Sequence, residues 1–460
     1  MAMSFRSWHE TIKDCELFSE RNKGVCTAPH NGISFHSSAW ALKITAFTAL
    51  FFFCALLVTA AQVSFPWENP PEKKILENGL SFIYQQDKSS SITVLQILIK
   101  GGKAAETQEK AGLAYLTTYL ALEIPDAEKV QELMSQASLV QMAGREDYSL
   151  INISCLSENL EATLKIISQI MLKPLFSGIR IDRAKERMND QRKINEDDAV
   201  GAGHNAAMEA LFAKTGYGLS VLGSKETIKA IKKKDIEDFH QNYFQAGNMV
   251  AVVISDLDKD PVLEILNKYL KDFPSGKPPE PEPIVALPAE EKKIYIEKDT
   301  EQFYVAFSFP LPKVSAKNFV LALAVENLLG KGVNSRLWHL RSEEKLAYNV
   351  NSRATQMREG GILESYLETG KEKKEVALQA LRKTLSELFE NGVTEEELEV
   401  TKTNVKASFL RNNETKEERV RSIGFLEALG LGYEFLNKLF EEVDPLSLEE
   451  INAFIKDVLN

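Results

Sequence analysis

The amino-acid sequence predicts an α+β protein of two homologous domains, each a mostly antiparallel sheet covered on one face by helices. Two observations lead to this fold class. Strand-like and helix-like segments recur in the same order in both halves of the chain, and a proline-rich segment separates the halves. The length agrees, because 460 residues are enough for two or three domains.

Each half opens with a predicted strand and a predicted helix. Residues 91–100 and 302–311 are rich in β-branched and aromatic side chains, which favour strands. Residues 111–122 and 317–329 carry apolar side chains at helical spacing. The two halves therefore begin with the same pair of elements.

A long charged helix is predicted later in each half, over residues 181–196 and 394–411. Thr394 and Glu397 have the spacing of a capping box, which marks the start of the second of these helices. The closing segments are also similar, with Met-Glu-Ala-Leu-Phe in one half and Leu-Glu-Ala-Leu-Gly in the other. A chance likeness between amphipathic helices is the alternative to a true repeat.

Composition divides the chain into four segments. Residues 1–61 are a leader, residues 62–271 a first domain, residues 272–292 a linker, and residues 293–460 a second domain. Five prolines lie between positions 274 and 283. Because proline cannot continue a helix or a central strand, these residues predict an extended connector.

The leader contains an apolar run from Ile44 to Ala61. The run suits the core of a signal peptide, with small residues at Val58-Thr59-Ala60 or Thr59-Ala60-Ala61 for cleavage. At roughly 18 residues it is also long enough to span a bilayer as an uncleaved anchor. Either interpretation predicts that residues 62–460 are exported.

The composition of the whole chain is that of an ordinary soluble globular protein, with 44% hydrophobic and 26% charged residues. A net charge of −11 argues against general nucleic-acid binding. Cys155 is the single cysteine after the leader, so it predicts a small core residue and no internal disulfide.

The three histidines after the leader are His204, His240 and His339. None lies three or four residues from another, so they carry no metal-site signal. His240 and His339 are expected at the surface or at the boundary of the core.

Several segments of the first half resemble the pitrilysin/insulinase family. In that family Ala-Gly-Leu-Ala is followed by His-x-x-Glu-His, in which two histidines bind zinc and the glutamate activates water. Here Tyr115, Thr118 and Tyr119 stand at those three positions, and Gln191 stands at the position of the third ligand, a glutamate. The resemblance implies a degenerate zinc motif and no metal on this chain. The matching segments are 78–80, 101–106, 111–114, 195–198, 216–218 and 222–228.

The second half resembles the same family more closely, through residues 330–337 and 341–350. In active members an arginine and a tyrosine seven positions apart hydrogen-bond the substrate backbone near the zinc. Arg341 and Tyr348 match them, although Lys345 stands where glycine is usual. The alternative is that Arg341 pairs with a nearby glutamate while Tyr348 packs within a strand.

The resemblance implies a non-catalytic, substrate-binding subunit of a heterodimeric zinc metalloendopeptidase in a bacterial periplasm, soluble or anchored by residues 44–61. A homologous catalytic subunit with His-x-x-Glu-His would carry the zinc, and Arg341 and Tyr348 would contact an extended peptide in trans. The alternative is a structural scaffold subunit of a membrane-associated complex with no role in proteolysis. Neither reading includes a nucleic acid or a cofactor bound by this chain itself.

Overall fold

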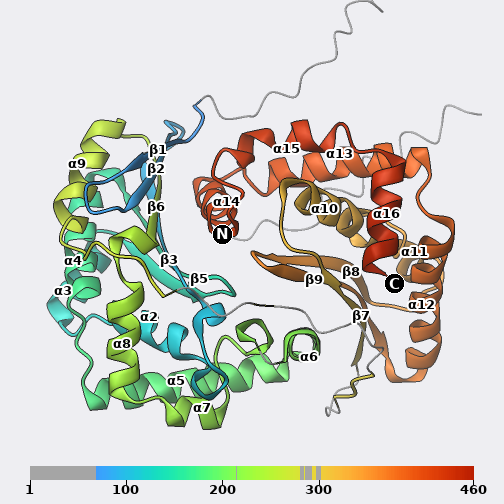
Figure 1. Cartoon of the computed structure of the whole chain (residues 1–460), viewed down its shortest axis with the longest axis horizontal. Coiled ribbons are helices and arrows are strands. Elements are labelled where there is room, and N and C mark those ends of the chain that lie inside the picture. The colour runs from blue at the N-terminus through green and yellow to red at the C-terminus, as the bar shows by residue number, and fades with distance from the viewer. Residues whose placement is uncertain (1–68, 214, 280–283, 285–292, 297–301, 460) are drawn as a thin grey trace, which may run out of the picture. The chain divides into compact units, whose positions relative to one another are not determined.

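The computed structural model describes residues 69–213, 215–279, 284, 293–296 and 302–459 (Figure 1). The predicted leader, residues 1–61, lies outside the described residues, and so does most of the predicted linker. Within the described part of the chain, no helix is both long enough and apolar enough to cross a membrane.

Six strands of the first half form one sheet in the order β1-β2-β6-β3-β5-β4. Strand β6 lies between β2 and β3, parallel to the first and antiparallel to the second. The other neighbouring pairs are antiparallel. The strands are β1 (Glu72–Ile75), β2 (Ser81–Gln86), β3 (Ile92–Lys100), β4 (Leu139–Gly144), β5 (Tyr148–Leu156) and β6 (Met249–Ser255).

Helices of the first half cover one face of this sheet (Figure 1). Side chains of α2, α4, α8 and α9 form one apolar core with the strands. Cys155 lies in this core, as predicted. The helices are α2 (Leu113–Leu122), α3 (Ala127–Ser135), α4 (Leu160–Leu172), α5 (Gly178–Asp197), α6 (Ala199–Phe212), α7 (Lys225–Ala230), α8 (Lys233–Tyr243) and α9 (Lys259–Leu270). The 3-10 turns are η1 (Lys103–Ala105), η2 (Gln108–Lys110), η3 (Ser157–Asn159), η4 (Gly216–Gly218) and η5 (Ala246–Asn248).

Gly112 sets the start of α2. Its φ of +93° is left-handed, a conformation that glycine adopts without strain. The carboxylate of Glu106 accepts hydrogen bonds from the backbone N–H groups of Gly112 and Ala114, at 2.9 and 2.6 Å. These N–H groups have no partner within the helix, so Glu106 stabilises its first turn. The helix therefore begins two residues later than the predicted start at residue 111.

The second half contains a sheet of three strands in the order β7-β9-β8, all antiparallel. Side chains of α10 and α12 pack on one face of this sheet. The elements are β7 (Gln302–Leu311), α10 (Ala316–Gly330), α11 (Trp338–Ser342), β8 (Asn349–Met357), β9 (Gly360–Gly370), η6 (Lys371–Lys373), α12 (Lys374–Asn391), α13 (Glu395–Arg411), α14 (Lys416–Leu429), α15 (Phe435–Val443) and α16 (Leu448–Val458).

The structure confirms the predicted fold class, and the predicted capping box of Thr394 and Glu397 opens α13. It also shows a feature that the sequence did not reveal: in each half, one helix packs against the sheet of the other half. Helix α14 packs on the second face of the first sheet, against β3 and β6, while α6 packs against β7 (Figure 1).

Polar contacts fix α14 on the first sheet. Arg419, which is buried, forms an ion pair with Asp87 at the end of β2. The ammonium group of Lys416 donates to the backbone carbonyls of Ser90 and Ile92, at 2.7 and 2.9 Å. Because these groups are largely removed from water, the contacts determine where α14 docks.

Candidate functional site

Three of the predicted site residues, Tyr115, Thr118 and Tyr119, lie on one face of α2. Thr118 is fully buried, and its hydroxyl donates to the backbone carbonyl of Ala114 at 2.8 Å. Tyr115 lies against Gly144 of the edge strand β4. Burial, together with the neighbouring Tyr119, raises the pKa of the Tyr115 phenol, so this group stays neutral.

The side chains of Tyr119 and Gln191 also form hydrogen bonds within the chain. The guanidinium of Arg187 donates to the hydroxyl of Tyr119 at 2.9 Å. Arg187 precedes Gln191 by one turn of α5, which packs against α2. The side chain of Gln191 is exposed and donates to Asn195 at 2.9 Å, so it turns along its own helix.

This set of side chains does not fit a zinc ion. Zinc prefers thiolate, imidazole and carboxylate ligands, and here the corresponding positions hold two phenols, a hydroxyl and an amide. A guanidinium next to Tyr119 would also repel a dication. No cluster of three or more histidine, cysteine, aspartate or glutamate side chains suited to a metal occurs in the described residues. The absence of zinc from this chain stays a prediction, and it rests on these contacts.

Restoring the family ligands tests the role of Arg187. A variant with Tyr115→His, Thr118→Glu, Tyr119→His and Gln191→Glu carries the full motif, and adding Arg187→Ala should lower its Kd for zinc by about tenfold, because a like charge is removed. Calorimetric zinc titration measures this effect. Arg183→Ala is the matched control, because Arg183 is also exposed and lies one turn earlier on the same face of α5. Equal effects of the two alanine substitutions would contradict the interpretation.

Arg341 and Tyr348 lie in the second half, on α11 and directly before β8. The guanidinium of Arg341 lies over the ring of Trp338, with 5.1 Å to the ring centre. Tyr348 is 63% exposed, and its backbone N–H donates to the carbonyl of Glu368 at 2.8 Å. Among the described residues, no hydrogen bond or ion pair joins either residue to α2.

The exposure of Tyr348 contradicts the alternative in which this residue packs within a strand. At this turn the carboxylate of Glu344 lies 3.3 Å from Nε2 of His339, so Glu344 pairs with His339. Lys345 has a φ of +53°, a left-handed conformation that favours glycine. This conformation agrees with the glycine that the family resemblance leads us to expect at this position. The proposed contact of Arg341 and Tyr348 with substrate remains a prediction.

A polar cluster around the buried side chain of Glu364 joins α6, β8 and β9 and had no sequence signal. Nδ1 of His204 lies 2.6 Å from a carboxylate oxygen of Glu364, and the Arg353 guanidinium donates to the same oxygen at 2.7 Å. Glu364 is fully buried. Burial alone would raise the pKa of Glu364, but His204 and Arg353 outweigh it and hold this pKa below its usual range. His240 and His339 are half-buried, as expected for boundary residues.

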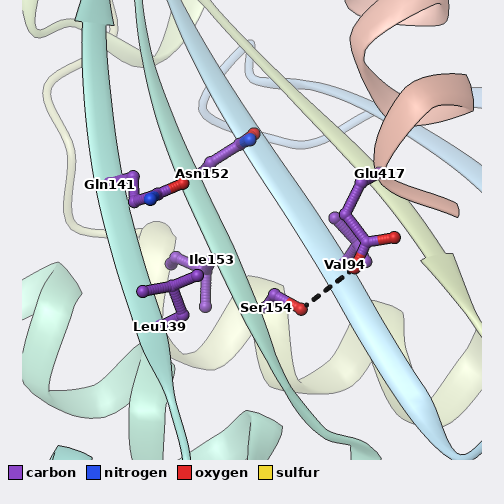
Figure 2. Close-up of a pocket in the computed structure, with 7 residues that line it drawn as sticks. All are labelled: Val94, Leu139, Gln141, Asn152, Ile153, Ser154 and Glu417. Carbon is purple, nitrogen blue, oxygen red and sulfur yellow. Dashed lines mark hydrogen bonds between the residues drawn. The ribbon is translucent and has the colours of Figure 1, made fainter. Parts of the chain in front are cut away.

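The edge strand β4 borders a small hollow on the sheet face that α14 covers (Figure 2). Ser154 of β5 donates to the carboxylate of Glu417 at the start of α14, at 3.2 Å. Leu139 of β4, which lines the hollow, is 54% exposed. The residues around it are Val94, Leu139, Gln141, Asn152, Ile153, Ser154 and Glu417. Side chains from both halves therefore meet beside the outer edge of β4.

Comparison with known proteins identifies the family of the chain. The fold is the α+β fold of two similar halves described above, and the predicted ligand positions on α2 hold Tyr115, Thr118 and Tyr119. Residues 81–225 match the family described as insulinase (peptidase family M16), and residues 230–405 match the peptidase M16 inactive domain. The chain belongs to the peptidase M16 family.

Three curated relatives illustrate the range of this family. The chain is 27% identical over 397 residues to the non-peptidase homolog YmxG of Helicobacter pylori, covering 84% of this chain and 90% of the relative. It is 20% identical over 391 residues to an uncharacterized zinc protease YmxG of Bacillus subtilis, covering 83% and 94%. It is 23% identical over 362 residues to the zinc protease PqqE of Helicobacter pylori, covering 75% and 81%.

Solved structures share the fold at low sequence identity. A protease from Helicobacter pylori has a TM-score of 0.78 at 18% identity, covering 85% of this chain and 97% of that chain. A peptidase M16 inactive domain from Pseudomonas fluorescens has a TM-score of 0.76 at 20% identity, covering 85% and 95%. A chain of complex III from Candida albicans has a TM-score of 0.73 at 16% identity, covering 84% and 93%.

Proposed function

We propose that this chain is the non-catalytic, substrate-binding subunit of a heterodimeric zinc metalloendopeptidase. One observation carries the proposal: the altered α2 lacks zinc ligands, while Arg341 and the 63% exposed Tyr348 remain available on the second half. Arg341 and Tyr348 are hydrogen-bond donors at the surface of a chain that we predict to bind no zinc. Such donors could act in an active site whose zinc is bound by another subunit.

The two side chains supply complementary chemistry. In the assembled pair, the partner's zinc would polarise the scissile carbonyl and activate water. The Arg341 guanidinium offers N–H donors in a fixed planar arrangement, and the Tyr348 hydroxyl offers one donor on a rigid ring. Donors aimed at an oxygen that gains negative charge lower the barrier by about 3 kcal/mol each.

The edge of β4 suits an extended peptide. Among the described residues, no strand pairs with the outer edge of β4, and the ring of Tyr115 lies against Gly144 at its end. A peptide added to this edge would gain backbone hydrogen bonds with few demands on its sequence. It would run past the positions where active relatives hold zinc.

The names of the relatives support a pair of homologous subunits, one catalytic and one non-catalytic. Helicobacter pylori has both a non-peptidase homolog and a zinc protease that are similar to this chain. We therefore expect a homologous partner with His-x-x-Glu-His to accompany this chain. From the predicted leader we also propose a location in the bacterial periplasm, with residues 44–61 as a cleaved signal or as an anchor.

Reconstitution tests the proposal. The full chain, the exported His-x-x-Glu-His homologue of the same organism, and their equimolar mixture are assayed against a fluorogenic peptide, with zinc measured in each sample. We expect zinc in the homologue alone, no hydrolysis by this chain, and a rate for the mixture at least about tenfold above that of the homologue.

Two outcomes would contradict the proposal. A rate unchanged by adding this chain removes its role in proteolysis. Stable co-purification with a membrane complex that lacks any His-x-x-Glu-His subunit would instead support the alternative function, a structural scaffold. The similarity in fold to a chain of complex III is relevant to that alternative.

A further inference from the structure

The hollow beside β4 combines apolar side chains with one carboxylate (Figure 2). Val94 of β3, Ser154 of β5 and Leu139 of β4 lie opposite one another in the register of the sheet. Opposite residues of paired strands point to the same face of a sheet. Val94 belongs to the core that contains side chains of α14, so all three residues face α14. The carboxylate is that of Glu417, which reaches this face from α14.

The carboxylate of Glu417 has no cationic partner among the described residues. Glu417 is half-buried, and it accepts a hydrogen bond from Ser154 at 3.2 Å. The two cations of the same helix turn are directed elsewhere. Arg419 pairs with Asp87, and Lys416 donates to two backbone carbonyls. The hollow therefore presents a negative charge that the protein itself does not neutralise.

The charges around the start of α14 add up in the same direction. Asp87, Asp256 and Glu417 lie close enough to Lys416 and Arg419 for their charges to interact. These three carboxylates exceed the two cations by one negative charge. A cation that enters the hollow therefore meets a favourable local potential.

We propose that this hollow binds a lysine or arginine side chain of a peptide that adds to the outer edge of β4. The aliphatic stem of that side chain lies on Val94 and Leu139, and its cationic group donates to Glu417. The inference rests on the peptide site at β4 in the proposed function. It deepens that function by naming the substrate class, extended peptides that carry a basic residue.

The distance across the sheet explains why a long side chain is required. A strand added to β4 lies two strand spacings from β5, which is about 9.6 Å. Every second side chain of the added strand points to the face that Leu139 and Gln141 also occupy. From there a side chain must cross β4 to reach Glu417 above Ser154. Lysine and arginine combine this length with an apolar stem and a positive charge, whereas shorter cationic side chains do not reach the carboxylate.

Peptide binding measured by fluorescence anisotropy tests this inference without hydrolysis. Labelled peptides of alternating valine and threonine carry one central lysine, norleucine, 2,4-diaminobutyrate or glutamate, and each is titrated with the full chain. We expect the lysine peptide to bind at least about fivefold more tightly than the norleucine peptide. The diaminobutyrate peptide carries the same charge on a shorter stem, so its gain from general attraction to the chain should stay below about twofold.

Variants of Glu417 place the effect in the hollow. Glu417→Gln should abolish the preference for lysine, and Glu417→Lys should reverse it, so that the glutamate peptide binds more tightly than the lysine peptide. Glu414→Gln changes an exposed glutamate just before α14 and is the matched control, which should keep the native preference. Circular dichroism checks that each variant is folded.

The outcomes separate this inference from the proposed function. Equal affinity for the lysine peptide and the norleucine peptide, or for the lysine peptide and the diaminobutyrate peptide, overturns the basic-residue site and leaves the peptide site at β4 in place. A preference for lysine that Glu417→Gln retains, or that Glu414→Gln loses to the same extent, has the same meaning. If none of the peptides binds, the peptide site at β4 is wrong and the inference falls with it.

Discussion

Replacing Arg341 by alanine and Tyr348 by phenylalanine is expected to lower the kcat of the reconstituted pair by at least about a hundredfold. Each donor contributes about 3 kcal/mol to stabilisation of the transition state, and about 1.4 kcal/mol corresponds to a tenfold change in rate. Because Arg341 and Tyr348 both lie at the surface, their replacement should leave folding and assembly unchanged. Steady-state kinetics and size-exclusion chromatography measure the two properties.

Matched substitutions control this experiment. Arg411→Ala removes another exposed arginine of the second half, and Tyr295→Phe removes the hydroxyl of a tyrosine that is 87% exposed. Both variants should retain full activity. If the control pair and the Arg341/Tyr348 pair lose activity equally, or if neither loses activity, the proposed contact with substrate is wrong.

Glu364→Ala is expected to lower the free energy of unfolding by about 3 kcal/mol. The substitution leaves His204 and Arg353, which lie 2.6 and 2.7 Å from one oxygen of the buried carboxylate, without their shared acceptor. Urea unfolding of the variant and the native chain measures the loss. The exposed pair of Glu434 and Lys438 is the control, and Glu434→Ala should cost well under about 1 kcal/mol.

The contribution of Glu364 should also depend on pH in a defined direction. Its pKa is lower in the folded chain than in the unfolded chain, so the unfolded state binds more protons as the pH falls. The stability from this group is present above the unfolded pKa and is lost as the pH falls through the folded value. The difference between the native chain and Glu364→Gln should therefore be constant near neutrality and shrink in acid. A difference that grows in acid would contradict the assignment.

Local elements could be predicted well from the sequence. The strand at residues 302–311 has the predicted bounds, and the capping box at Thr394 places the start of α13. These features depend on side chains within a few residues of each other. The docking of α14 on β3 could not be predicted, because the contact of Arg419 with Asp87 joins residues more than 300 positions apart.

The candidate site also has features that could be predicted from the sequence and features that could not. The spacing of Tyr115, Thr118 and Tyr119 on one helix was predictable because helical periodicity places them together. The contact between Tyr119 and Arg187 joins α2 to α5 and carries no motif of its own. The cluster around Glu364 likewise joins three separate segments, so residue spacing could not reveal it.

Photocrosslinking from position 348 tests the central claim most directly. A benzoylphenylalanine residue replaces Tyr348, and the reconstituted pair is irradiated with an uncleaved analogue of its peptide substrate. If the chain completes its partner's site in trans, the crosslinks join position 348 to the peptide and, without peptide, to the zinc-bearing subunit. Crosslinks confined to this chain, in the presence of both partner and peptide, would contradict the account.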